Sequence, residues 1–488
     1  MPKIRVTSPL PYPGTPIKSL FQNIGLAVVL NLGIKTAWVL ANNIVQDRIG
    51  HTDFGLYLAL YSLGFLFLAL SDMGVNQYTA KTLAHQPQLL RQLFPNLLSL
   101  KLFFAFVYPF FMLGVGAVLG YSGLELWYLF LLCSVHSVLQ INFFFRSNFQ
   151  AFQKFRLDAF ASVLDRVIML GIVVVLLLTH ISVESYIYAY LASAVATMVV
   201  LYVFLVRLFG VIRPQWQTAR MRNLLAKSFP FAVITVLYSI NDKVDQVMLE
   251  RIIGGEAGKH ETGLYGGAYR WVDTTMMYLW TVLPIFFAKF AKHLTDDRAL
   301  SRLLAFGQPI ATLPMLFVGV FAMFYGDKLL FLFTNSTPAE LATMESCLRI
   351  LFLAVLINGY FAIYSTLLTS TGHERFVSWM IFVSILLNVT LNFIFIPQFG
   401  ARASAWTTVT SFGFLSLSYL YYIQFRLPVR IPFRNLGKLL LVSLAFTAAF
   451  WGLSWTNLPW YAVTALAGGV LLALTYFSGM IKLRDEIE

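Results

Sequence analysis

The chain has 488 residues, of which 58% are hydrophobic and only 12% are charged, and its mean hydropathy is +0.73. This composition excludes an ordinary soluble protein and indicates an integral membrane protein. We attribute the net charge of +13 to basic loops at the membrane surface, and we therefore expect no nucleic-acid partner.

Apolar runs long enough to cross a bilayer as helices follow one another along the whole chain. Stretches such as GIVVVLLLTH do not alternate between polar and apolar residues, so the runs are typical of helices and not of barrel strands. About fourteen spans are predicted, at 22–46, 54–73, 96–119, 124–143, 158–179, 185–209, 228–249, 264–288, 303–325, 345–369, 376–396, 403–425, 436–454 and 459–480.

The fold class that follows is an all-α polytopic membrane protein with two pseudo-symmetric six-helix lobes and a C-terminal helix pair. The first run carries Lys35 and no cleavage site of small residues, so we expect a retained span and no signal peptide. The predicted divisions are a cytoplasmic segment (1–21), an N-lobe (22–209), a basic cytoplasmic linker (210–227), a C-lobe (228–425), the terminal helix pair (436–480) and a cytoplasmic tail (481–488).

An internal echo supports the two lobes. Residues 31–57 align without gaps on residues 239–265, an offset of 208 that places Lys35 over Lys243 and the Gly-Leu-Tyr at 55–57 over the Gly-Leu-Tyr at 263–265. Because six is an even number of spans, both lobes enter the membrane from the same side. The repeat is then parallel, with its axis along the membrane normal.

The positive-inside rule orients the chain. With both termini inside, most basic residues lie in inner segments, and the outer loops hold only Arg48, Arg251, Lys259, Lys328 and Arg402. All loops are short, and no GxxxxGK[ST] segment is present, which excludes a nucleotide-driven pump within this chain. Cys133 and Cys347 fall inside spans, so we expect neither a disulfide nor a metal site.

Six basic residues fall inside the predicted spans: Lys35, Lys101, Arg166, Lys243, Arg270 and Arg349. A charge at a helix centre costs about 2.5–3.5 kcal/mol, so these side chains are expected to face the protein interior. One interpretation is a cationic cavity built from Lys35, Lys243 and Arg270, with Lys101 and Arg166 as outer members. The other is a set of structural ion pairs, which is the expectation for Arg349 beside Glu345.

Three charges stand together in the stretch SINDKVDQVML (239–249). Asp242 and Asp245 lie about 60° apart on one helix face, whereas Lys243 lies about 100° from Asp242. We therefore predict that Lys243 is not simply the salt-bridge partner of Asp242, and that it faces either a wet cavity or a packed ion pair. Arg270 and Asp273, three residues apart, can neutralise each other.

Three segments carry a resemblance to a known family. They are GHTDFGLYLALYSLGFLFLALSDMG (50–74), DQVMLERIIGG (245–255) followed by GLYGGAYR (263–270), and LLNVTLNFIFIPQFGARASAWTTV (386–409). In this order and spacing they resemble the polysaccharide-export branch of the multidrug/oligosaccharidyl-lipid/polysaccharide (MOP) exporter superfamily, which includes the O-antigen flippases. Ala403 departs from the more usual Gly of that family.

The resemblance implies a MATE/MOP-like flippase, not an enzyme. Its cargo would be an undecaprenyl-diphosphate-linked oligosaccharide that moves from the inner to the outer leaflet of the bacterial inner membrane by alternating access, for surface polysaccharide or lipopolysaccharide biosynthesis. Membrane lipids and polymerase or assembly proteins are the other expected partners. No cofactor or metal is expected, and a proton, sodium or the membrane potential would drive transport.

The candidate site residues fall into two groups. Those expected to bind the diphosphate or the sugars are Lys35, Lys243, Arg270, Lys101, Arg166, Trp38, Tyr57 and Tyr265. Those expected to couple an ion are Asp242, Asp245 and Asp273.

Three alternatives stay open. A lipid II flippase would have the same number of spans, and a cation-coupled multidrug antiporter would have about twelve and a more acidic cavity. A membrane-embedded transferase would need a histidine or carboxylate near the interface, for which His136 and Asp165 are isolated candidates.

Overall fold

The computed structural model describes residues 33–79, 90–211, 213–294, 296–429 and 431–480, except for residues 35 and 153. Within these ranges every regular element is a helix, and no strand is present. Residues 36–49 form the first described helix. The elements that follow are α2 (His51–Leu66), α3 (Ala69–Asp72), α5 (Leu90–Val118), α6 (Leu124–Ala151), α7 (Phe155–Leu178), α8 (Val183–Phe209), α9 (Thr218–Ile253), α10 (Gly255–Lys292), α11 (Asp297–Leu329), α12 (Pro338–Ser370), α13 (Glu374–Phe399), α14 (Ala401–Arg426), α15 (Phe433–Ser454) and α16 (Trp460–Ser478).

Every apolar run predicted from residue 96 onward corresponds to one helix between α5 and α16. Of the helices in the described ranges, ten are long and apolar enough to cross a membrane, and the bent α9 makes eleven. Three predicted spans remain. The span at 22–46 overlaps the helix over 36–49, and the span at 54–73 is interrupted after Leu66. The span at 403–425 corresponds to α14, which buries a row of Ser and Thr side chains. The helical fold class is confirmed, and the count of fourteen is compatible with it.

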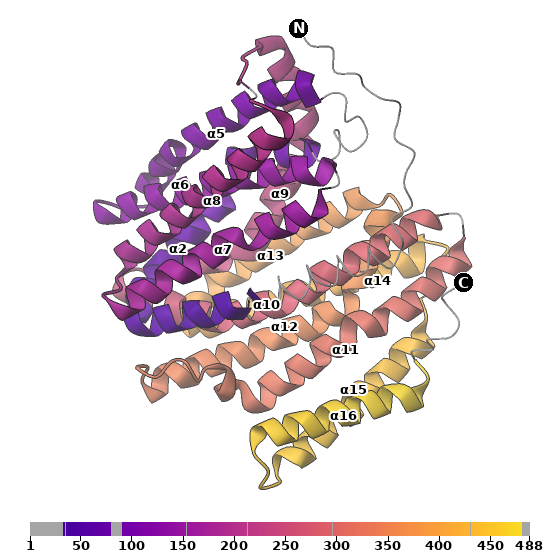
Figure 1. Ribbon diagram of the computed structural model, residues 1–488. Coiled ribbons are helices and arrows are strands. Elements are labelled where there is room, and N and C mark those ends of the chain that lie inside the picture. Colours follow the sequence, from indigo (N-terminus) through magenta and orange to yellow (C-terminus); the bar gives the residue numbers. More distant parts are fainter. Residues whose placement is uncertain are drawn as a thin grey trace.

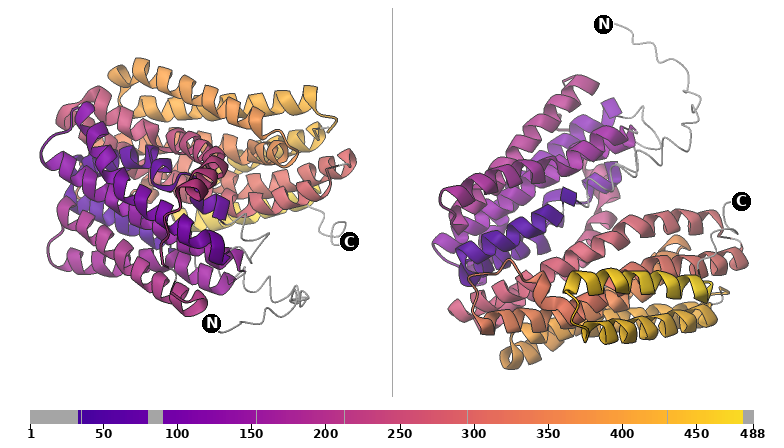
Figure 2. Two further views of the ribbon diagram at one scale, coloured as in Figure 1. Left: turned by 90° about the horizontal axis from the view of Figure 1, so that it is seen from above. Right: turned by 60° about the horizontal axis from the view of Figure 1, so that its bottom comes forward.

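The helices form two groups. In Figure 1 the indigo-to-magenta helices α2 and α5 to α8 lie above the salmon-to-yellow helices, and Figure 2 shows the two groups approaching each other at one end and diverging toward the other. Below, "first half" means residues 36–209 and "second half" means α10 to α16. The pair α15 and α16 lies at the edge of the second half, where Phe446 and Val463 pack against Leu316 and Val320 of α11.

The two halves touch through a reciprocal glycine contact between α2 and α10. A Cβ on Gly55 would overlap the carbonyl oxygen of Lys259, and a Cβ on Gly263 would overlap the carbonyl oxygen of His51. The offset of 208 residues relates His51 to Lys259 and Gly55 to Gly263, so the two contacts are equivalents of each other. This is the geometry of an internal twofold axis, and it gives the sequence echo a physical meaning.

Helix α9 packs against both halves. Met221 and Leu224 lie in the core of the first half, whereas Leu237, about four turns onward, packs on the core of the second half. The helix bends by 46° between Phe229 and Phe231. It begins at Thr218, inside the segment 210–227 that the sequence predicted as a linker.

The chain breaks after α2 at the point where it meets this bend. The short α3 ends at Asp72. It is followed by Met73, whose φ of 48° is left-handed, and by Gly74, whose φ is 73°. A Cβ on Gly74 would overlap the carbonyl oxygen of Ser228 in α9, so glycine is required both for the turn and for the close approach.

Candidate functional site

Lys243 of α9 lies between two carboxylates. Its Nζ is 2.8 Å from Oδ2 of Asp273 in α10 and 3.5 Å from Oδ2 of Asp242, and it lies 4.7 Å from the centre of the Tyr269 ring. The Tyr269 hydroxyl donates to Oδ1 of Asp242 at 3.2 Å. The three charged side chains retain 11–31% exposure, so the cluster is only partly buried.

This arrangement agrees with one prediction from the sequence and corrects another. Lys243 lies 3.5 Å from its neighbour Asp242 but only 2.8 Å from Asp273, so Asp242 is not simply its salt-bridge partner. Asp273 pairs with Lys243 and not with Arg270. Two carboxylates around one ammonium group leave the cluster with an excess of one negative charge.

Arg270 of α10 joins the two halves through neutral partners. Its Nη1 donates to Oδ1 of Asn43 at 2.7 Å, its Nη2 donates to Oε1 of Gln46, and its guanidinium lies 4.8 Å from the centre of the Phe54 ring. Its Nε has no hydrogen-bond partner. Among the described residues no carboxylate forms an ion pair with it, so Arg270 places a guanidinium without a salt-bridge partner between the halves.

Asp245 occupies a separate polar site inside the second half. Only 6% of the residue is exposed, and its oxygens accept from Asn392 Nδ2 at 2.7 Å, from the Thr408 hydroxyl at 2.7 Å and from the Tyr265 hydroxyl at 3.2 Å. Asn392 also donates to Asn388 at 2.9 Å. Four helices, α9, α10, α13 and α14, thus converge on one carboxylate that has no basic partner among the described residues.

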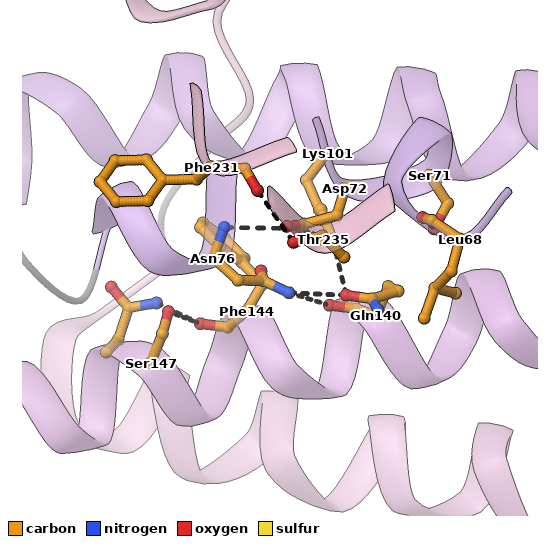
Figure 3. A network of polar contacts seen from close by, with 11 residues as sticks. Leu68, Ser71, Asp72, Asn76, Lys101, Gln140, Phe144, Ser147, Phe231 and Thr235 are labelled. Carbon is orange, nitrogen blue, oxygen red and sulfur yellow. Dashed lines mark hydrogen bonds and ion pairs between the residues drawn. The ribbon is translucent and has the colours of Figure 1, made fainter. Parts of the chain in front are cut away.

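Lys101 lies away from these groups, in the first half (Figure 3). It is completely buried, and its Nζ contacts Oδ1 of Asp72 at 2.5 Å and Oε1 of Gln140 at 3.5 Å. Asn76 closes the network, because its side chain donates to Gln140 Oε1 at 2.7 Å and its backbone donates to Asp72 at 3.2 Å. For Lys101 the geometry corresponds to the ion-pair interpretation, and the pair ties α5 to the break after α2.

The first half contains a cavity of about 480 Å³ between the helix over 36–49 and helices α2, α6, α7 and α8, with Trp280 of α10 at its edge. Two predicted site residues, Trp38 and Arg166, line it. The other two aromatic candidates do not. Tyr57 packs among aromatic rings of the first half, and Tyr265 is fully buried against Asp245.

The remaining candidates from the sequence are placed as follows. Arg349 pairs with Glu345 at 2.6 Å, as expected for a structural residue. His136 is 2% exposed, its Nε2 lies 3.0 Å from the carbonyl oxygen of Tyr61, and it lines the cavity together with Asp165. Lys35 lies outside the described residues.

Polar contacts between the halves gather at one end of the bundle. Asp47 accepts from the backbone N of Asn335 at 2.9 Å and from the Thr334 hydroxyl at 3.0 Å, and Lys259 lies 3.1 Å from Glu125. Asp47 lies near the end of the helix over 36–49, and Thr334 and Asn335 lie between α11 and α12. Glu125 and Lys259 lie near the starts of α6 and α10. This is the end that the sequence predicts to be outer. The halves are therefore closed there.

Sequence reasoning missed the neutral members of these sites. Asn43 and Gln46 stand in the segment ANNIVQ, and Asn392 stands in a motif quoted only for its family resemblance. Their amides carry no charge, so no energetic argument about the bilayer singled them out. One sequence signal could have identified Asn43 and Gln46: the two amide residues are three positions apart, so they share one face of the first helix.

Solved structures share this arrangement of helices. The chain aligns with "Lipid II flippase MurJ, inward closed conformation" at a TM-score of 0.70 and 14% identity, covering 93% of this chain and 98% of that one. It aligns with an inward-facing multidrug resistance MATE family transporter of the MOP superfamily at a TM-score of 0.65 and 17% identity, covering 79% and 93%. A MOP superfamily transporter from Pyrococcus furiosus aligns at 0.57 and 15% identity, covering 83% and 94%.

The fold is thus that of the MOP superfamily of membrane transporters. The model of the family described as "Polysaccharide biosynthesis protein" matches residues 20–288, more than half of the 488 residues, and the MatE family model matches residues 296–394. The chain belongs to the polysaccharide biosynthesis protein family. No curated protein matches it.

The resemblance predicted from the three segments is therefore confirmed, and so is the prediction of a transporter. The alternative of a membrane-embedded transferase is wrong, because the matched families and the similar structures are transporters and not enzymes. His136 and Asp165 accordingly lie in a transporter cavity and not in an active site.

Proposed function

We propose that this protein flips an undecaprenyl-diphosphate-linked oligosaccharide from the inner to the outer leaflet of the bacterial inner membrane, for the synthesis of a surface polysaccharide. Membership of the polysaccharide biosynthesis family supports a saccharide cargo on a lipid carrier. Both termini are then cytoplasmic, and the closed end with Asp47 and Asn335 faces outward, so cargo loads from inside.

The observation that carries the proposal is the state of Arg270. A guanidinium held between two halves by amide oxygens keeps its full positive charge, and its planar set of donors matches the oxygens of a diphosphate. Asn43 and Gln46 can release their hydrogen bonds without leaving a buried charge behind. Arg270 is thereby available to an anion that enters between the halves.

Lys243 enters the mechanism by exchange of partners. In the empty state Asp242 and Asp273 neutralise it. An approaching diphosphate can take the place of one carboxylate beside Lys243, once that carboxylate has bound a cation or has moved away. Binding of the anionic cargo and binding of the cation are then linked at this cluster. A like charge held against the diphosphate would otherwise oppose loading.

Asp245 is the proposed site for the coupled cation. It is a carboxylate surrounded by oxygen and amide groups and by no base, and burial of such a charge is costly unless a proton or a sodium ion compensates it. The membrane potential adds to the drive, because moving two negative charges outward across an inside-negative membrane releases roughly 4.6 kcal/mol per 100 mV, at about 2.3 per charge.

The test is transport in liposomes that contain the purified protein and lipid-linked oligosaccharide extracted from the producing cell. Arg270→Gln should slow flipping at least about tenfold, since a lost charge-assisted pair is worth about 1.5–3 kcal/mol, and Arg270→Lys should keep part of the rate. Arg349→Gln, a matched change at an arginine 49% exposed and far from the site, should flip at the wild-type rate.

Two results would count against the proposal. If Arg270→Gln flips the lipid-linked oligosaccharide at the wild-type rate, Arg270 does not bind the diphosphate. Faster flipping of lipid II than of the extracted lipid-linked oligosaccharide would favour the lipid II alternative, which shares the diphosphate but carries a different headgroup.

A further inference from the structure

The cavity of the first half has a composition that the proposed diphosphate site does not explain. Its floor is aromatic. Tyr61 and Tyr190 lie stacked with an interplanar angle of 16° and centroids 6.2 Å apart, and Trp38 lies 6.1 Å from Tyr190. His136 lies 4.5 Å from Tyr61, and its ring is fixed by the carbonyl oxygen of that residue. All four of these rings line the same cavity.

Planar polar groups also line the cavity. Asp165 and Arg166 of α7 line the cavity, and among the described residues neither forms an ion pair. Gln140 and Asn142 of α6 supply amides. Asn142 donates to the carbonyl of Ala194 at 3.1 Å while its Oδ1 is buried without a partner, so one acceptor in this lining is unsatisfied.

We propose that this cavity is the saccharide subsite of the transporter, binding one or two pyranose rings of the cargo. The inference rests on the proposed function and adds to it the place of the sugars. A pyranose ring has an apolar C–H face, which stacks on aromatic rings, and a rim of hydroxyl groups, which pair with carboxylate, amide and guanidinium groups. Both surfaces have their complement here.

Other occupants fit less well. A polyprenyl or acyl chain would leave Asp165, Arg166 and the Oδ1 atom of Asn142 without partners, which is costly in a low-dielectric site. A cationic drug would meet Asp165 but also its neighbour Arg166, which lines the cavity as well. The volume of about 480 Å³ falls within the roughly 300–1,000 Å³ of small-molecule sites.

The position of the cavity also suits a sugar attached to a diphosphate. Tyr61 belongs both to the cavity and to the surroundings of Lys243, since the charges of Lys243, Arg166 and Asp165 all act on its hydroxyl. A headgroup that reaches Lys243 with its phosphates can therefore place its first sugars against Tyr61, Tyr190 and Trp38.

The test compares two ligands on the purified protein: undecaprenyl diphosphate without sugar, and the lipid-linked oligosaccharide extracted from the producing cell. Trp38→Ala and Asp165→Asn should each weaken binding of the glycosylated lipid by about tenfold and leave binding of the bare diphosphate lipid unchanged. Trp38→Phe should retain part of the affinity. Trp455→Ala, at a tryptophan 76% exposed between α15 and α16, is the matched control and should bind both lipids normally.

The outcomes separate the two proposals. Unchanged affinity of Trp38→Ala and Asp165→Asn for the glycosylated lipid overturns the saccharide subsite while the diphosphate proposal stands. If the wild-type protein binds the two lipids with equal affinity, the saccharide subsite is likewise overturned. If Arg270→Gln binds the bare lipid as tightly as the wild type does, the diphosphate proposal fails instead. Retained binding of bare lipid also shows that each cavity variant is folded.

Discussion

Asp245 is buried among partners that are all neutral, and this makes it different from Asp72, Asp242 and Asp273, each of which contacts a lysine. Burying a carboxylate without a basic partner is costly, and a proton or another cation can compensate its charge. Asparagine has nearly the same shape and retains one acceptor. The substitution Asp245→Asn therefore removes the charge and little else.

We expect Asp245→Asn to flip the lipid-linked oligosaccharide more slowly and to lose the dependence of the rate on the coupling cation. The measurement is the flipping rate in liposomes over a series of sodium concentrations at fixed pH, and over a pH series without sodium. Asp327→Asn, at an exposed carboxylate that pairs with Lys328, is the control. A variant whose rate follows sodium and pH as the wild type does would exclude Asp245 as the coupling residue.

At the scale of single residues the sequence located the charges but not their partners. The cost of burying a charge predicted that Lys101 and Lys243 face the protein interior, and both have carboxylates within reach. Which carboxylate each one meets depends on how helices from distant parts of the chain pack. Asp72 and Lys101 are 29 positions apart, and no local pattern links them.

At the scale of helices, the contact between α2 and α10 depends on two glycines that have no room for a side chain. Gly263→Ala would place a methyl group against the carbonyl oxygen of His51, and because both atoms belong to helix backbones the helices have to separate. Overpacking of this kind costs typically about 1–3 kcal/mol. The closed end would lose that much of its stability.

We therefore expect Gly263→Ala to populate the state in which this end is open. The measurement is the distribution of distances between spin labels on α2 and α10, which should shift to longer values. Gly171→Ala is the control, because a Cβ on Gly171 meets no atom within 4 Å and its helix α7 should be unaffected. An unchanged distribution for Gly263→Ala would mean that the closed end is held by other contacts.

Helices were predictable because their apolar runs are long and their ends are marked. Thr337, Pro338 and Glu340 form a capping box at the start of α12, a pattern that is local in sequence. The break after α2 was not predictable, because it depends on the packing of Gly74 against α9 and on the buried Asp72–Lys101 pair. The echo between residues 31–57 and 239–265 includes both glycines of the contact between α2 and α10.

At the scale of the whole molecule, transport by alternating access requires the closed end to open. Asp47 and Asn335 lie there in direct contact across the two halves. Cysteines at these two positions, in a background with Cys133 and Cys347 replaced by alanine, can be joined by a short reducible cross-linker. We expect the cross-linked protein to stop flipping and to recover after reduction.

The control is the pair His260 and Glu340, which are hydrogen-bonded at 2.7 Å but lie in the same half. Joining cysteines at these two positions should leave flipping unchanged. Persistent flipping by the Asp47–Asn335 cross-linked protein, with cross-linking complete on a gel, would show that the cargo passes without separation of the halves at this end.

The course of α9 also bears on how the protein is made. Met221 and Leu224 fill part of the core of the first half, although the ribosome adds them after α8 is complete. A nascent chain that stops at residue 209 consequently lacks part of this hydrophobic core. Synthesis of the first two turns of α9 completes the core of the first half. The same helix continues into the second half, so the two halves are already joined when the second half is made.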